Sequence, residues 1–110
     1  MGSKLLIIIA TGEKQKALTG LMYARNALKQ GWLDDVKIVF FGPSEQLIVE
    51  DEQVSKQVKA IAVVGESFAC KAISDRKGFS GEMEKLGVKV DYVGPIISNF
   101  IKDGYLPMVW

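Results

Sequence analysis

Histidine is absent from the sequence, and cysteine occurs only once, as Cys70. Without histidine, the chain has neither a Ser-His-Asp triad nor a Cys-His pair, and one cysteine alone does not build a zinc site. Haem, iron–sulfur and CxxC redox centres lack their ligands in the same way. A carboxylate site for magnesium stays possible in principle, but the acidic residues show no convincing spacing for one. We therefore expect no cofactor and no metal, and Cys70 is the side chain left for covalent chemistry.

An excess of either charge is also missing, because 14 Lys and Arg stand against 13 Asp and Glu. This balance gives no electrostatic reason to expect binding to nucleic acid or to a membrane surface. No apolar stretch approaches the roughly 18 residues of a membrane-spanning helix, and residues 1–30 lack the cleavage site of a signal peptide. A lone cysteine cannot form an internal disulfide, which favours a reducing compartment. We expect a cytoplasmic protein.

The chain alternates between short apolar runs and stretches in which apolar residues recur at helical spacing. Its 110 residues suit one domain with its own core, and no linker, repeat or low-complexity segment divides them. We expect helices between strands at residues 4–10, 36–41, 66–70, 88–93 and 105–110. This order predicts a single α/β domain over residues 1–110, with three α/β/α layers, a mostly parallel five-stranded sheet and a Rossmann- or flavodoxin-like layout.

Polar and small residues mark the expected ends of the helices. Gly31 suits the position after the long first helix, Gly78 separates two short helices, and Pro95 suits the first position of the last helix. Glu45 is favourably placed in the first turn of a short helix, because a helix N-terminus carries partial positive charge. The residues that suit helix N-caps are Ser44, Asp51 and Ser80.

The final segment, from Tyr105 to Trp110, is predicted to be an edge strand, because Pro107 has no N–H group to donate to a neighbouring strand. Its apolar side chains, together with Phe100, make this part of the chain a candidate contact between subunits. Trp32 also lies near the end of an element, where packing in the core or in a subunit interface is expected rather than base stacking.

Residues 60–64 leave one ambiguity. Their sequence, AIAVV, fits a buried strand as well as the end of a helix, because a short apolar run has no clear period. If they form a strand, Cys70 lies inside the following helix. If they end a helix, residues 66–70 form the strand, and Cys70 lies where that strand passes into a helix.

Cys70 at such a junction is a candidate nucleophile. The first N–H groups of a helix have no partner within the helix and carry partial positive charge, which favours the reactive thiolate. Lys71, Arg76 and Lys77 add positive charge nearby. The alternative is that Cys70 is a packed core residue, since free cysteine is among the most buried residue types.

Thr11 and Gly12 follow the first strand, at the side of the sheet where α/β domains bind ligands. The segment lacks the later glycines of GxGxxG and the GK[ST] of a P-loop, so a phosphate site is not expected. Another polar ligand could still reach the start of the following helix. A purely structural turn is the alternative.

The later half of the chain carries a family resemblance. A strand ending in Phe68-Ala69-Cys70 precedes a polar helix, and LGVKVDYVG (residues 86–94), Ile97-Ser98 and DGYLPMVW (residues 103–110) follow. These features resemble the small archaeal and bacterial members of the DsrE/DsrF/TusD-like (DsrEFH-like) family of sulfur-relay proteins. The resemblance spans nearly the whole chain in length and element order. In that family the cysteine follows a strand, which favours the strand at residues 66–70.

The resemblance implies a DsrE-like fold and a Cys70 that accepts sulfur as a persulfide or thiosulfonate and passes it to a partner. Lys71 could hold the sulfur anion and Arg76 could meet an anionic donor such as thiosulfate, although both also suit a solvated helix surface. Family members form trimers, hexamers or hetero-oligomers of related subunits. We therefore expect an assembly, with sulfur donor and acceptor proteins as further partners.

Two other hypotheses stay open beside this sulfurtransferase-type carrier. The chain could be a non-enzymatic module that binds a small ligand or a nucleotide in a pocket near Thr11-Gly12 and Gly94-Pro95. It could also be a structural subunit of a hetero-oligomer, with no chemistry of its own.

Overall fold

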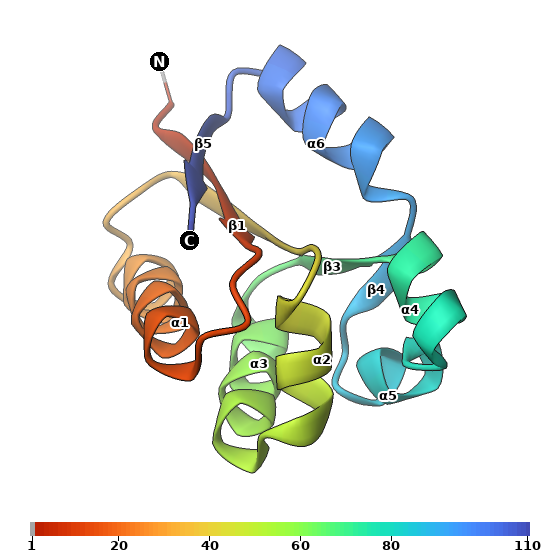
Figure 1. Ribbon diagram of the computed structural model, residues 1–110. Helices are drawn as coiled ribbons and strands as arrows, with labels where there is room; N and C mark the ends of the chain where they lie inside the picture. Colours follow the sequence, from red (N-terminus) through yellow and green to blue (C-terminus); the bar gives the residue numbers. More distant parts are fainter. Residues whose placement is uncertain (1) are drawn as a thin grey trace.

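The computed structural model describes residues 2–110 and contains a five-stranded sheet in which all strand pairs are parallel. The strands are β1 (Lys4–Ile9), β2 (Asp35–Phe40), β3 (Ser67–Cys70), β4 (Lys89–Asp91) and β5 (Leu106–Val109). Their order across the sheet is β4-β3-β2-β1-β5 (Figure 1). This order shares the run from β3 to β1 with the Rossmann layout and differs from the flavodoxin order.

Helices cover both faces of the sheet, which confirms the predicted three-layer α/β/α domain. They are α1 (Lys14–Gln30), α2 (Ser44–Glu50), α3 (Glu52–Val64), α4 (Lys71–Lys77), α5 (Ser80–Lys85) and α6 (Val93–Lys102). In Figure 1, α1, α2, α3 and α5 lie below the sheet and α6 lies alone above it. No helix within residues 2–110 is long and apolar enough to cross a membrane.

Alternation along the strands divides the apolar core into two clusters. Successive side chains of a strand point to opposite faces, so Leu5 and Ile7 face one side of the sheet and Leu6 faces the other. The larger cluster joins the first face to α1, α3 and α5. The smaller cluster lies on the face covered by α6, and its buried members are Leu6, Val39, Phe68, Cys70 and Val93.

The predicted N-caps are right at one helix and wrong at two. Asp51 caps α3 by accepting a hydrogen bond from the Val54 N–H. Ser44 and Ser80 are instead the first residues of α2 and α5. The Ser44 hydroxyl donates to the Ile9 carbonyl over 2.5 Å, and the Ser80 hydroxyl donates to Asp75 over 2.5 Å. Each hydroxyl therefore fixes its helix to a neighbouring element, and neither caps a free N–H group.

The prediction that Pro95 is the first residue of the last helix is also wrong. The strand expected to reach residue 93 ends at Asp91, and Val93 is already the first residue of α6. Pro95 is the third residue of that helix. A first-turn proline is tolerated because the N–H groups of the first turn have no partner within the helix.

The edge position predicted for the final strand is confirmed, because β5 pairs only with β1. The Trp110 N–H donates to the Ile8 carbonyl. The backbone N–H and C=O groups of residues 106, 108 and 110 therefore point toward β1, whereas those of residue 107 point away from the sheet. The Trp110 ring packs on Gly20 of α1, where an added Cβ would lie 2.8 Å from the Trp110 Cγ. This glycine allows α1 to approach the end of β5.

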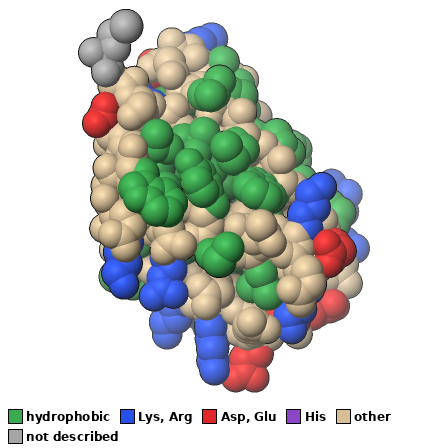
Figure 2. Space-filling view, turned by 90° about the vertical axis from the view of Figure 1, so that its left-hand side faces the viewer, with side chains coloured by type: hydrophobic (Ala, Val, Ile, Leu, Met, Phe, Trp, Pro, Cys, Tyr) green, Lys and Arg blue, Asp and Glu red, His purple; other side chains and the backbone are tan. Residues whose placement is uncertain are grey.

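An apolar surface covers the side of the molecule that carries β5. Figure 2 shows apolar side chains gathered across this side, with Lys and Arg side chains along its lower edge. Leu106 and Trp32 are 68% and 58% exposed. The Trp32 ring lies 6.1 Å from the Tyr23 ring, and Leu106 lines a small hollow together with Leu33. We call this region, defined by Tyr23, Trp32, Leu33 and Leu106, the β5 face.

Candidate functional site

Cys70 is the last residue of β3 and directly precedes α4. Residues 60–64 complete α3, so the ambiguity is resolved in favour of a strand before the cysteine. The thiol is free, and the residue is 6% exposed. Because α4 has only seven residues, few peptide dipoles add up behind Cys70. Cys70 therefore lies at the predicted junction between a strand and a helix. The short α4 provides only a small positive potential there.

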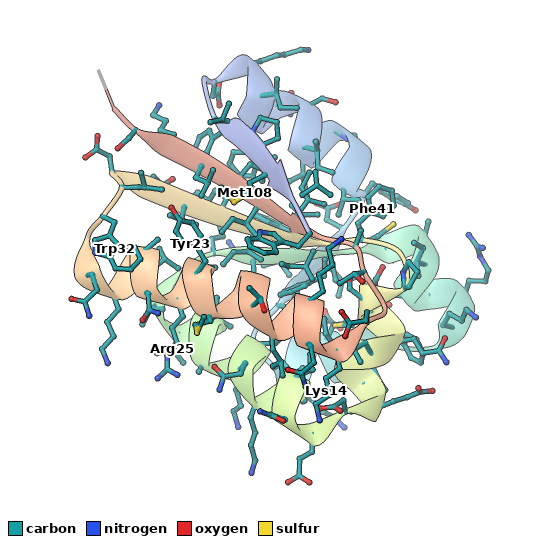
Figure 3. All side chains as sticks on the ribbon, turned by 60° about the vertical axis from the view of Figure 1, so that its left-hand side comes forward. Lys14, Tyr23, Arg25, Trp32, Phe41 and Met108 are labelled. Atoms are coloured by element: carbon teal, nitrogen blue, oxygen red, sulfur yellow. The ribbon has the colours of Figure 1, made fainter. Side chains whose placement is uncertain are left out.

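Apolar side chains surround Cys70 on the face covered by α6. Phe68 and Val93 belong to the same buried cluster, and Ile73 packs against it from α4. Phe41 directly follows β2 and is 40% exposed, and its N–H donates to the Ile9 carbonyl. Figure 3 shows Phe41 at the opposite end of the sheet from Trp32.

Asp91 on β4 is the direct partner of Cys70 in the sheet. The Lys89 ammonium lies 5.7 Å from the centroid of the Phe68 ring, so these paired residues share one face. Because side chains alternate, Cys70 and Asp91 share that face as well. The Asp91 carboxylate accepts a hydrogen bond from the Tyr92 N–H over 2.7 Å. A negative charge is therefore one strand away from the thiol.

Lys71 follows Cys70 directly, but its ammonium is bound to another group. It donates to the Asp75 carboxylate over 2.8 Å, one turn further along α4. This hydrogen bond is the main reason why the pKa of Lys71 is raised and that of Asp75 is lowered. Both side chains are largely solvent-exposed, so the pair is weak. Breaking this ion pair costs little free energy, so the Lys71 ammonium can leave Asp75 and bind an anion.

Arg76 lines a pocket of about 280 Å³ between α2 and α4, together with Lys77 and Ile73. Ile73 also packs against the cluster that contains Cys70. One side chain therefore contacts both the pocket and the surroundings of the thiol. Lys71 and Arg76, both named as candidates from the sequence, lie on α4, the helix that begins directly after Cys70.

Thr11 and Gly12 lie at the same edge of the sheet but two strands away from Cys70. Adjacent strands are about 4.8 Å apart, so the separation is on the order of 10 Å. The Thr11 hydroxyl accepts a hydrogen bond from the Glu13 N–H over 3.0 Å, and the Thr11 N–H donates to the Trp110 carbonyl. Gly12 faces Pro43, where an added Cβ would lie 3.1 Å from the proline Cβ. These contacts are those of a structural turn.

Glu45 and Ser74 form a buried contact between α2 and α4. Both residues are fully buried, and the Ser74 hydroxyl donates to one Glu45 oxygen, whereas the other oxygen has no partner within residues 2–110. Burial raises the pKa of Glu45 to about 7, and the Ser74 hydrogen bond lowers it in part. Glu45 lies in the first turn of α2, as predicted, but α4 covers its side chain.

Comparison with known proteins supports the fold and leaves the activity open. No protein-family model matches the chain, and no curated protein matches it. A solved structure of a conserved protein of unknown function from Bacteroides thetaiotaomicron is similar, with a TM-score of 0.91 and 25% sequence identity. The match covers 98% of this chain and 95% of that chain. The α/β architecture is therefore shared over almost the whole length of both proteins.

Proposed function

We propose that the protein is a sulfur carrier that holds sulfane sulfur on Cys70 and transfers it to a partner protein in the cytoplasm. The observation that supports this most is the position of Cys70, at the carboxyl end of β3 and 6% exposed. Cys70 is buried among apolar side chains at this edge of the sheet, which shelters a bound sulfur from solvent. The resemblance to sulfur-relay proteins supports the same residue.

The chemistry requires one thiol and neither a metal nor a histidine. The Cys70 thiolate attacks the outer sulfur of a persulfide donor, the donor thiolate leaves, and Cys70 becomes a persulfide. The thiolate of an acceptor then attacks the outer sulfur, which moves to the acceptor and restores the Cys70 thiolate. With tetrathionate as donor, the same attack releases thiosulfate and leaves a thiosulfonate on Cys70. A second cysteine nearby would discharge the persulfide as a disulfide, and the chain has none.

The neighbours of Cys70 suit a carrier better than a turnover enzyme. The apolar side chains of Phe68, Ile73 and Val93 limit the access of water and of small oxidants to the bound sulfur. Lys71 and Arg76 are the cations we propose for holding the anionic sulfur species, Lys71 after release of Asp75. Thr11 and Gly12 receive no role in this proposal, because they lie two strands away.

We further propose that the carrier acts as an oligomer, in contact through the β5 face with copies of itself or with related subunits. The large exposed side chains of this face support an apolar contact. Pro107 removes an outward N–H group from β5, so side-chain packing is favoured over the extension of the sheet by another strand.

Cyanolysis tests the carrier function directly, because cyanide removes sulfane sulfur as thiocyanate. The protein is incubated with polysulfide, freed of excess donor and treated with cyanide. We expect about one thiocyanate per chain, and none from Cys70→Ser. A loaded protein that fails to pass its sulfur to any added thiol would contradict the carrier function, and an unloaded one would contradict sulfur binding.

A further inference from the structure

A pocket of about 280 Å³ opens at the carboxyl ends of β2 and β3, between the start of α2 and one side of α4. The residues used in the argument are Gly42 and Gln46 on one wall and Ile73, Arg76, Lys77 and Phe79 on the other. We propose that this pocket binds a small organic anion. Its carboxylate or phosphate group meets Arg76 and Lys77, and its apolar part lies against the remaining side chains of the α4 wall.

The charge of the pocket is positive and uncompensated. Within residues 2–110, neither Arg76 nor Lys77 forms an ion pair, whereas Lys71 on the same helix is paired with Asp75. No acidic residue lines the pocket. A position in the last turn of α4 explains why cations are tolerated there, but not why two of them share one pocket. An anion would supply the missing partner, with Arg76 available for bidentate binding.

The rest of the lining suits the organic part of such a ligand. Ile73 and Phe79 are half-buried and give the α4 wall an apolar surface. On the opposite wall, Gln46 donates one side-chain N–H to Glu50 over 2.9 Å, which fixes its amide. The amide oxygen and the second N–H remain for a polar group of the ligand. Apolar walls with a few fixed polar groups are typical of small-molecule sites.

Buried hydrogen bonds hold the two walls in place. The Ser74 hydroxyl of α4 donates to the Glu45 carboxyl of α2, one residue before Gln46. The Ser44 hydroxyl ties the start of α2 to the end of β1. A site whose walls are fixed before binding loses less conformational entropy when the ligand enters. The pocket also lies at the carboxyl ends of parallel strands, where open α/β sheets bind ligands.

The size of the pocket restricts the class of ligand. Its 280 Å³ is just below the range of about 300–1,000 Å³ that is usual for small-molecule sites. A ligand with one aromatic or branched apolar group and one anionic group fits this volume, whereas a dinucleotide exceeds it. The inference does not rest on sulfur transfer, although Arg76 and Ile73 also belong to the proposed carrier site.

Chemical-shift titration of the ¹⁵N-labelled protein tests the proposal with phenyl phosphate and benzoate as probes. Inorganic phosphate and benzyl alcohol each carry only one half of the expected chemistry and serve as comparisons. We expect saturable shifts for Gly42, Gln46 and Gly78 with the two organic anions, and weaker binding of both comparison compounds. Sulfur loading of Cys70 is a separate readout, so either proposal can fail without the other.

A pair of double variants separates the pocket from general charge. Arg76→Gln with Lys77→Gln is expected to weaken the binding of phenyl phosphate about tenfold or more. Arg25→Gln with Lys29→Gln removes the same charge from a groove between α1 and α3. This control is expected to leave the binding of phenyl phosphate unchanged. Equal weakening in both double variants, shifts confined to another surface, or no saturable shift at millimolar probe would each overturn the proposal.

Discussion

Cys70 and Asp91 are paired residues of β3 and β4, and their side chains lie on the same face of the sheet. The negative charge of Asp91 repels anionic sulfur species that approach the cysteine. Since Lys71 is paired with Asp75, no cation next to the cysteine fully balances this charge. The surroundings of Cys70 therefore protect its sulfur more than they increase its reactivity. This suits a carrier that must not react with every thiol in solution.

Replacement of Asp91 should make Cys70 more reactive. Asp91→Asn removes the charge but keeps an oxygen to accept the Tyr92 N–H. We expect alkylation by the anionic reagent iodoacetate to become about two- to threefold faster at low salt, because the repulsion between the reagent and Asp91 is removed, with a smaller gain at high salt. Glu82→Gln, which removes an exposed charge from α5, is the control. An unchanged rate in Asp91→Asn would show that this carboxylate does not influence the thiol.

Glu45 should make the protein less stable as pH rises. The pKa of this carboxyl is 4.5 ordinarily and about 7 in the folded protein, so the folded state binds more protons between these values. Stability is then complete below about pH 4.5, falls as pH rises to about 7 and is constant above it, with a total loss of about 3 kcal/mol. Urea unfolding of the protein and of Glu45→Gln at pH 5 and pH 8 measures this loss.

Two variants sharpen this test. Glu45→Gln should lose most of the difference between pH 5 and pH 8, because the amide does not titrate. Ser74→Ala should enlarge it, since the Ser74 hydrogen bond lowers the pKa of Glu45. An equal pH dependence in all three proteins would mean that other groups cause it.

The contact between Gly20 and Trp110 should not tolerate a methyl group. A Cβ at Gly20 would lie 2.7 Å from the Ile9 side chain and 2.8 Å from the Trp110 ring. Gly20→Ala is therefore expected to lower the free energy of unfolding by about 1–3 kcal/mol. Gly81→Ala, in a helix with open space around the new Cβ, should be neutral or stabilising. Chemical denaturation of both variants gives the comparison.

Charge on the β5 face should dissociate the proposed oligomer. Leu106→Glu places a carboxylate in the centre of this face, and light scattering after size exclusion should then report a monomer. Val63→Glu changes an even more exposed apolar residue, 82% exposed on α3, and should leave the assembly intact. If the unmodified protein is a monomer even at high concentration, the proposed contact through the β5 face is wrong.

The fold could be predicted from sequence wherever a local pattern carries the information. The apolar run of β1, the period of α1 and the missing N–H group of Pro107 each suffice for a correct prediction. The N-cap predictions for Ser44 and Ser80 are wrong because the partners of these hydroxyls, Ile9 and Asp75, come from other elements. A local preference for caps and first turns does not contain those contacts.

The site was predictable only in part for the same reason. Cys70 is conspicuous as the lone cysteine, and its position after a strand follows from the element order. Asp91 reaches it only through the pairing of β3 with β4, which no single segment encodes. Arg76 was singled out for its charge, but the pocket that it lines depends on how α2 packs beside α4.

Intact-mass spectrometry after incubation with thiosulfate, tetrathionate or polysulfide is the most direct test of the carrier function. The account predicts a gain of one sulfur or of one thiosulfonate group, removed by reductant, located at Cys70 and absent in Cys70→Ser. If no donor modifies the folded protein while the unfolded chain reacts readily, Cys70 is a packing residue. That result would contradict the carrier function and leave only the fold.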